Sequence, residues 1–247
     1  MAVVTANLAE TSALPIPQLA RGAALAFANA EDLFREAAAL FACKAYSQTL
    51  FLHQISMEEC GKIEILGGWA TSHLMGHSFD VKKIESALAS HKAKNFANAY
   101  MLPVSAAERQ AREAFDWSTA IETFQQQQSE FHSKSNEKKN AALYVDFVEG
   151  LFHAPSERIT EDMCYEIAGR NSEFIELVRP KVNMLGRWAE DPEAARSALI
   201  EFKTRFEQLR EQHPSDPQRA FDIVLAEMLT KAKLRRANKS VPPAENA

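Results

Sequence analysis

Apolar residues recur every three or four positions along most of the chain, which places them on one face of an α-helix. The first run follows the proline-rich residues 15–17 and consists of Leu19, Ala23, Phe27, Ala30, Phe34, Ala37 and Phe41. It predicts a long amphipathic helix that must pack on a partner. A second helix is expected over residues 44–66, ending at Gly67-Gly68, and the two should pack as a helical hairpin.

Two further helices are expected in the next part of the chain. Asp80 is a candidate N-cap for a helix that ends before Pro103. Ser105 and Glu108 have the capping-box spacing of another helix, which should continue to Phe124 and end in a glutamine-rich turn.

The following segment is less regular. Residues 133–140 are polar and indicate a break, and residues 143–147 alternate and are β-prone. Because no second strand is expected nearby, we predict a short extended or irregular segment against the bundle. A fifth long helix should begin at Thr160, with a kink at Pro180.

Two shorter helical patterns close the chain. One follows Asp191-Pro192 and the other begins at Asp216-Pro217. They predict a C-terminal helical hairpin over residues 193–238, followed by a disordered tail at 239–247. The predicted fold class is therefore all-α, with about five long helices before the hairpin.

Composition agrees with this prediction. The 247 residues are 46% hydrophobic and include only eight glycines, which favours helices. Cys43, Cys60 and Cys164 are too widely spaced to indicate a zinc site or a disulfide framework, so a reducing, cytoplasmic location is expected. A signal peptide and a membrane span are not expected. The net charge of −5 argues against a body covered with nucleic-acid-binding charge, although residues 231–239 are locally basic.

Several catalytic classes lack their motifs. The chain has no glycine-rich phosphate loop, no Gly-x-Ser-x-Gly and no His-Glu-x-x-His. A di-iron bundle needs Glu-x-x-His on two helices, and this spacing does not occur; Glu149 and His153 are four residues apart. No metal and no cofactor are expected.

Two glutamates of the second predicted helix stand among apolar positions. Glu58 precedes Lys62 by one turn, and the simplest interpretation is a surface ion pair worth about 0.3–0.5 kcal/mol. Glu59 lies between Ile55 and Ile63 on the apolar stripe. Burial of Glu59 would require a cation or several donors, so it is the stronger functional candidate.

Two other groups are candidates for chemistry. His91 lies on an apolar face, where a histidine is more often a core residue than a catalyst, but Lys92 and Lys94 flank it and favour the neutral imidazole that a general base needs. Lys139-Asn140 precedes Tyr144 and Asp146. This second group is either a turn and a strand whose aspartate acts as a cap, or part of a site.

The chain resembles a known family in three motifs that occur in order. They are Glu58-Glu59-x-Gly61-Lys62, His91-Lys92-Ala93-Lys94, and Lys139-Asn140 leading into Leu143-Tyr144-Val145-Asp146. In them the chain resembles the AbiV-type abortive infection proteins, bacterial anti-phage factors of the HEPN superfamily. The resemblance implies a HEPN-like bundle over residues 18–190, a homodimer, and phage defence by arrest of host growth or translation.

Many HEPN proteins are metal-independent endoribonucleases that use an arginine, the polar residue after it and a histidine one to two turns further on. Here Arg205 precedes His213 by eight residues, outside that spacing and beyond the matched region. The nearest equivalent is Lys139-Asn140, which no histidine follows. We predict that His91 supplies the imidazole if the bundle brings it beside residues 139–146.

Three functions stay open. The first is an RNA-cleaving or translation-blocking effector with His91 as the base. Its other expected site residues are Lys139, Asn140, Glu59, Tyr144 and Asp146, with Lys62, Lys92 and Lys94 as RNA- or phosphate-binding groups. The second is a non-catalytic effector that binds the translation machinery or a phage protein. The third is a structural domain whose buried polar network only fixes packing. Expected partners are an RNA or ribosome-associated target and a phage protein trigger, with no membrane.

Overall fold

The computed structural model describes residues 15–78, 80–214 and 216–239, and this part of the chain is almost entirely helical. The predicted all-α fold class is confirmed. The chain divides into two compact units between Pro192 and Glu193. None of the described helices is long and apolar enough to cross a membrane.

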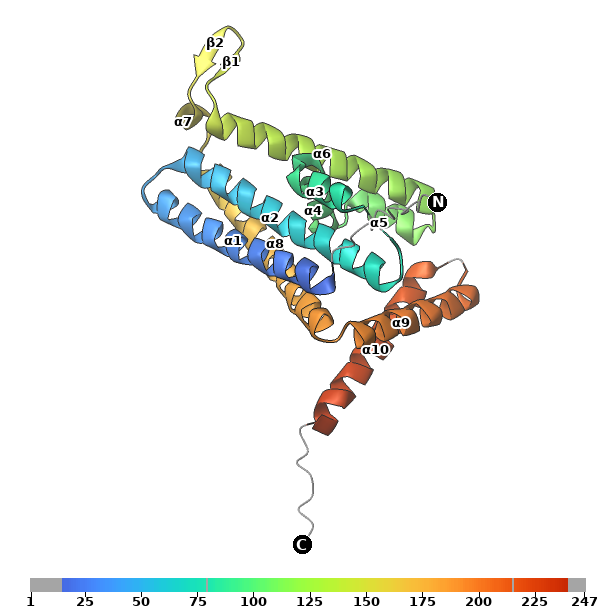
Figure 1. Cartoon of the computed structure of the whole chain (residues 1–247). Helices are drawn as coiled ribbons and strands as arrows, with labels where there is room; N and C mark the ends of the chain where they lie inside the picture. Colours follow the sequence, from blue (N-terminus) through green and yellow to red (C-terminus); the bar gives the residue numbers. More distant parts are fainter. Residues whose placement is uncertain (1–14, 79, 215, 240–247) are drawn as a thin grey trace, which may run out of the picture. The chain divides into compact units, whose positions relative to one another are not determined.

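The core of the first unit consists of three long helices. Helix α1 (Ile16–Ala42) and helix α2 (Tyr46–Leu74) form the predicted hairpin, and α8 (Glu161–Glu190) packs against both (Figure 1). The predicted end of α2 at Gly67-Gly68 is wrong. Helix α2 continues because Ala70 and Leu74 extend its buried face, and this packing outweighs the helix-breaking tendency of glycine.

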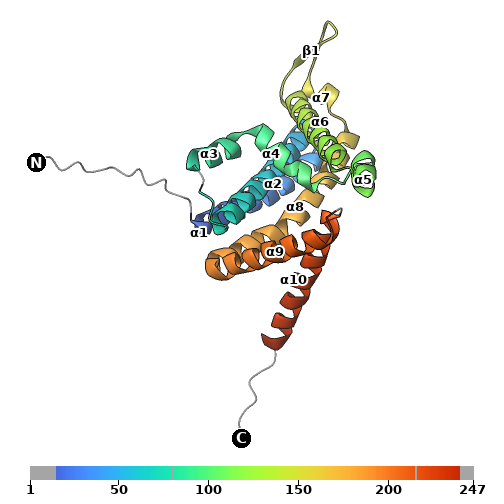
Figure 2. The ribbon, with the colours of Figure 1, turned by 90° about the vertical axis from the view of Figure 1, so that its right-hand side faces the viewer.

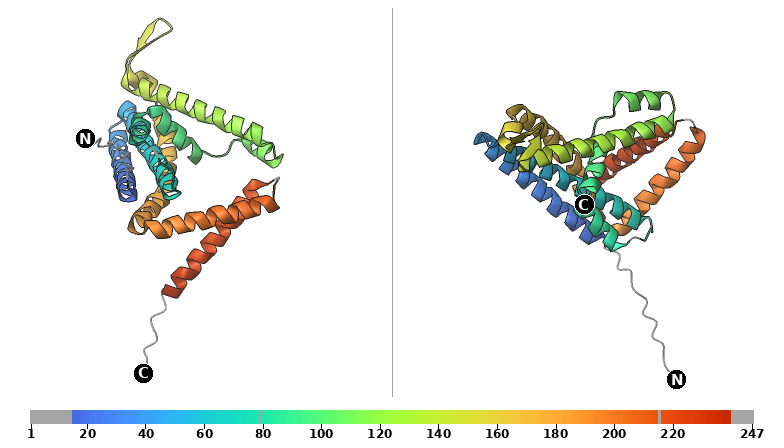
Figure 3. Two further views of the ribbon diagram at one scale, coloured as in Figure 1. Left: turned by 45° about the vertical axis from the view of Figure 1, so that its right-hand side comes forward. Right: turned by 90° about the horizontal axis from the view of Figure 1, so that it is seen from above.

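The predicted single helix from Asp80 is two helices. Asp80 caps α3 (Val81–Ala89) as predicted, with its side chain accepting from the Lys82 amide at 2.9 Å. Ser90 then adopts an extended conformation and caps α4 (His91–Asn98) through the Ala93 amide at 3.2 Å. A short 3₁₀ turn (Ala99–Met101) follows. The cap at Ser90 redirects the chain so that α4 lies between α2 and α6 (Figures 1 and 3).

Helix α5 (Ala106–Glu113) begins at the predicted Ser105 cap, but it ends at Glu113 and does not continue to Phe124 as predicted. Helix α6 (Trp117–Leu143) passes without interruption through the predicted glutamine-rich turn and through the predicted break at 133–140. The polar residues there are compatible with a packed helix because two of them, Ser135 and Lys139, are buried against polar partners on α2.

The prediction that no second strand lies near residues 143–147 is also wrong. Strand β1 (Asp146–Val148) pairs antiparallel with β2 (Leu151–His153) through a Glu149-Gly150 turn in which both residues have positive φ. The hairpin projects beyond the end of α6 (Figures 1 and 2) and is not packed against the bundle. The helical turn α7 (Pro155–Arg158) leads into α8, whose predicted cap Thr160 accepts from the Met163 amide at 3.3 Å.

Helix α8 continues through Pro180 without ending. The second unit is the predicted helical hairpin of α9 (Pro192–Gln212) and α10 (Pro217–Lys239). Its core consists of Leu209, Ala220 and Val224, with Phe202, Phe206, Ile223 and Met228 packed around them. The predicted tail at 239–247 lies outside the described residues, except for Lys239 at the end of α10.

Candidate active site

The side chain of Glu58 on α2 collects donors from two other helices and is only 3% exposed. Its Oε1 accepts from Lys139 Nζ of α6 at 2.9 Å. Its Oε2 lies 2.8 Å from Lys94 Nζ and 2.6 Å from His91 Nδ1, both of α4. We call these four residues the Glu58 cluster. Three segments far apart in the sequence therefore meet at one carboxylate.

Electrostatics keep this carboxylate ionised. Burial by itself would raise the pKa of Glu58, but hydrogen bonds from Lys94, Lys139 and His91 outweigh burial, so the pKa lies below its ordinary value. Both lysines are buried and depend on Glu58 to balance their charge. The cluster thus carries one more positive charge than negative, without counting the imidazole.

His91 is the member of the cluster that reaches solvent. Its side chain is 54% exposed, and it stands at the first position of α4. An ionised carboxylate can only accept, so Nδ1 carries the proton shared with Glu58. In the neutral ring Nε2 is then a free acceptor, and we find no hydrogen bond to it among the described residues. This is the arrangement of a histidine base oriented by a carboxylate.

Comparison with known proteins settles the family. The family model of the AbiV HEPN proteins matches residues 18–176, which is more than half of the chain. The chain belongs to the AbiV family. This membership indicates a role in abortive infection, a defence response.

A relative of this AbiV-family chain is the uncharacterised protein y4gJ of Sinorhizobium fredii. The two are 46% identical over 107 residues, which cover 43% of this chain and 56% of that protein. The chain thus spans about half the length of the curated relative that it matches. No solved structure matches the chain.

The two glutamates of the first AbiV motif have different partners from those predicted. The predicted Glu58–Lys62 pair is wrong, because Lys62 Nζ binds Glu59 Oε1 at 2.6 Å. Adjacent helical residues point about 100° apart, so Glu58 faces α4 and α6 while Glu59 faces a groove beside α1 and α3. Glu59 is buried, as its position on the stripe predicted, and Lys62 is the cation that its burial requires.

The second and third AbiV motifs are only partly brought together. Lys92 is exposed, with its ammonium 5.1 Å from the centre of the Phe96 ring. Asn140 is exposed on α6, and Tyr144, the residue that follows the end of α6, is also exposed. Asp146 forms an ion pair with Arg158. The structure therefore joins His91, Lys94 and Lys139 through Glu58, and places Asn140, Tyr144 and Asp146 outside this cluster.

Sequence reasoning missed Glu58 as the centre of the site. Its signal is a ladder of two pairs, each four residues apart: Gln54 and Glu58 on α2 face Ser135 and Lys139 on α6. Ser135 Oγ donates to Gln54 Oε1 at 3.0 Å, in parallel with the Lys139–Glu58 bond. The ladder is visible only if residues 133–140 are read as helix. His132 lies between the predicted glutamine-rich turn and the predicted break, and α6 runs through both.

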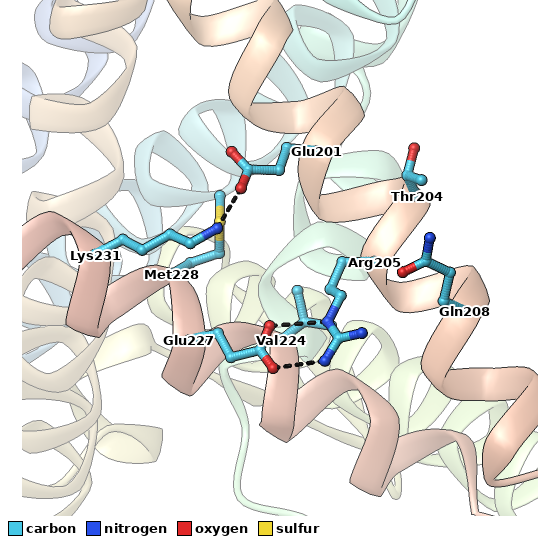
Figure 4. Close-up of a pocket in the computed structure, with 8 residues that line it drawn as sticks. All are labelled: Glu201, Thr204, Arg205, Gln208, Val224, Glu227, Met228 and Lys231. Carbon is cyan, nitrogen blue, oxygen red and sulfur yellow. Dashed lines mark hydrogen bonds and ion pairs between the residues drawn. The ribbon is translucent and has the colours of Figure 1, made fainter.

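No group of His, Cys, Asp and Glu that could hold a metal ion occurs in the described part of the chain. In the second unit, Arg205 lines a pocket of about 320 Å³ between α9 and α10 (Figure 4). Its guanidinium donates twice to Glu227, at 3.0 and 2.9 Å. Beside it, Lys231 pairs with Glu201. Arg205 is therefore bound to Glu227 and links the two helices of the hairpin.

Proposed function

We propose that the protein is an abortive-infection effector that cleaves RNA without a metal ion, with His91 as general base. The observation that carries this proposal is the Glu58–His91 hydrogen bond: a buried, ionised carboxylate holds Nδ1 while the ring remains half exposed. RNA is too large to enter a closed pocket, so the general base must be accessible at the surface, as the His91 imidazole is.

The reaction that fits is attack of a ribose 2′-oxygen on the adjacent phosphorus. His91 Nε2 takes the 2′-hydroxyl proton, the new 2′-oxygen–phosphorus bond forms and the bond to the 5′-oxygen breaks. Glu58 stabilises the imidazolium that results. The proton returns through water to the 5′-oxygen, which leaves a 2′,3′-cyclic phosphate and a 5′-hydroxyl.

The lysines divide into two roles in this proposal. Lys94 and Lys139 are buried and bound to Glu58, so they position the carboxylate and do not contact phosphate. Lys92 is exposed next to His91 and is the cation available to the RNA backbone. Lys62 of α2 is partly exposed but paired with Glu59, and both line the groove beside α1 and α3.

A second candidate is a non-catalytic effector that blocks the translation machinery or senses a phage protein. Its support is the β1–β2 hairpin, which exposes Phe147 and Phe152 at 64% and 76%. Exposed apolar residues of this kind are typical of protein contact surfaces. A homodimer, a ribosome-associated target and a phage protein trigger remain predictions under either candidate.

The decisive experiment incubates the purified protein with total cellular RNA in excess chelator. We expect discrete cleavage products from the wild type, and a loss of about 10²- to 10⁴-fold in rate for His91→Ala. His77→Ala, at an exposed histidine after α2, is the matched control and should cleave like the wild type. Intact RNA together with arrested translation would favour the second candidate instead.

A further inference from the structure

We propose that His132 on α6 is a second catalytic histidine, which donates a hydrogen bond from Nε2 to a phosphate oxygen while His91 acts as base. This inference rests on the proposed RNA cleavage and adds a residue to the same site. His132 lies in none of the three AbiV motifs described above.

The position of His132 follows from one direct contact between α4 and α6 and from one link between them that runs through Glu58 of α2. His91 and Asn95 are one turn apart and share a face of α4, and the Asn95 amide nitrogen lies 3.3 Å from His132 Nδ1. On α6, His132 and Lys139 are two turns apart on one face, and Lys139 binds the same Glu58 as His91. Asn95 therefore holds His132 against α4 one turn from His91, and Lys139, on the same face of α6 as His132, binds the carboxylate that holds His91.

The partners of the two rings fix opposite proton positions. The Asn95 atom that faces His132 is Nδ2, which carries hydrogens and can only donate, so Nδ1 of His132 accepts and Nε2 carries the proton of the neutral ring. At His91 the carboxylate can only accept, so Nδ1 carries a proton, and in the neutral ring Nε2 is then the acceptor. His91 thus offers an acceptor for the proton of the 2′-hydroxyl, and His132 offers a donor to a phosphate oxygen. RNA cleavage by attack of the 2′-oxygen uses both.

The surroundings of His132 favour this neutral donor form. Burial lowers its pKa, and the positive charges of Lys92 and Lys139 lower it further, while Glu58 acts in the opposite direction and His91 is also within electrostatic range. The His132 ring packs edge-on against Phe96, with centroids 5.9 Å apart, which limits its rotation. We find no hydrogen bond to Nε2 of His132 among the described residues.

The role in the step is hydrogen bonding without proton transfer. As the 2′-oxygen attacks, negative charge grows on the two non-bridging phosphate oxygens, and Nε2–H of His132 donates to one of them. The proton of the 2′-hydroxyl still goes to His91, so His132 leaves the proton balance unchanged. This role predicts an effect on kcat and not on folding.

Cleavage assays separate this role from a packing role. His132→Leu removes the donor and should lower kcat by about 10²- to 10³-fold. His132→Gln places an amide N–H near the position of Nε2–H and should recover at least tenfold over His132→Leu. The matched control is Gln128→Leu, which removes the 2.8 Å bond from Gln128 to the Phe96 carbonyl, another link between α6 and α4. It should cleave like the wild type.

The outcomes distinguish this inference from the proposed function. Loss of cleavage in His91→Ala with full activity in His132→Leu would reject the role of His132 and keep His91. Equal losses in His132→Leu and Gln128→Leu would show a packing role only. An inactive wild type would reject the proposed cleavage itself.

Side-chain ¹⁵N NMR of the histidines tests the structural basis independently of activity. We expect the Nδ1–H tautomer at His91 and the Nε2–H tautomer at His132, assigned by comparison with the His91→Ala and His132→Gln spectra. On addition of a 2′-O-methyl RNA, which cannot be cleaved, the Nε2–H signal of His132 should shift. A proton on Nδ1 of His132, or a signal that does not respond to this RNA, would overturn the inference.

Discussion

Gly61 of α2 lies directly against the carbonyl oxygen of Lys94 in α4, so that a Cβ at position 61 would be 2.5 Å from that oxygen. Real Cβ atoms essentially never approach another atom so closely. The absence of a side chain at position 61 lets α4 cross α2 one turn from Glu58. This crossing brings His91 and Lys94 within reach of the carboxylate.

The first prediction follows from this contact. Gly61→Ala should displace α4 and cost about 1–3 kcal/mol of unfolding free energy, because the clash is with backbone and cannot be relieved by a side-chain rotation. RNA cleavage should fall as well, since His91 and Lys94 move with α4. Urea denaturation and the cleavage assay measure the two effects.

Gly68 of the same helix is the matched control. Nothing lies within 4 Å of a Cβ at that position, so Gly68→Ala should leave activity unchanged and stabilise the helix by about 0.5–1 kcal/mol. If both alanine variants behave alike, the close crossing at Gly61 does not position the site.

The second prediction concerns the charge of Glu58. Glu58→Gln leaves Lys94 and Lys139 buried without a counter-charge and should destabilise the bundle by about 3–5 kcal/mol. Glu59→Gln should cost only about 1 kcal/mol, because Lys62, the partner of Glu59 among the described residues, is partly exposed and can still donate to the amide oxygen. Chemical denaturation of both variants at neutral pH gives the comparison.

Replacing Glu58 and one lysine together sharpens this test. Glu58→Gln combined with Lys139→Met removes one negative and one positive charge, so the double variant should recover part of the stability lost in Glu58→Gln. Additive losses would mean that Lys139 and Glu58 are not coupled.

Helical periodicity predicted α1, α2 and α8 and several caps because it depends on local spacing alone. It failed where the tertiary structure decided the outcome. Ser90 breaks a helix that its apolar stripe would have continued, since the cap lets α4 turn onto α2. Residues 133–140 are too polar to suggest a buried helix, but their partners Gln54 and Glu58 lie about eighty residues earlier in the sequence.

Three residues of the Glu58 cluster were among the predicted site residues, but its central carboxylate was not, and Glu59, Asn140, Tyr144 and Asp146 lie outside the cluster. His91, Lys94 and Lys139 were identified because they are charged or titratable residues in apolar surroundings. Glu58 was assigned to Lys62 because a local pair four residues apart is the simplest interpretation of a single helix. A sequence does not show which way a helix is rotated within the bundle, and this rotation decides whether Glu58 or Glu59 faces α4 and α6.

The third prediction is a pH dependence that arises away from the site. His53 is buried against Phe34 and Asn171, and burial lowers its pKa from 6.5 to about 4. Between these values the unfolded chain binds a proton that the folded chain does not, so stability falls as the pH drops through this window. The loss attributable to His53 should approach about 3 kcal/mol by pH 4.

Comparison of variants isolates this contribution. His53→Asn should show a shallower loss of stability than the wild type between pH 6.5 and pH 4, measured by urea denaturation. His77→Asn, at an exposed histidine, should keep the wild-type slope. An unchanged slope in His53→Asn would mean that another group causes the acid sensitivity.

The fourth prediction separates the two candidate functions through the β1–β2 hairpin. The rings of Phe147 and Phe152 contact each other at a tilt, with centroids 4.9 Å apart, and are otherwise largely exposed. Replacing both with serine should change the unfolding free energy by no more than about 0.5 kcal/mol. By contrast, Phe174→Ala in the core should cost about 3–5 kcal/mol. The hairpin supplies no group to the Glu58 cluster, so RNA cleavage by the double serine variant should equal that of the wild type.

Phage defence of cells that carry the same double variant distinguishes the two candidate functions. If RNA cleavage is the whole effector function, defence should persist in Phe147→Ser/Phe152→Ser and disappear in His91→Ala. If the hairpin contacts a protein of the host or the phage, defence should disappear in the double variant although its purified form still cleaves RNA. Loss of defence in the double variant together with full defence in His91→Ala would reject His91 chemistry as the basis of abortive infection and favour occlusion through the hairpin.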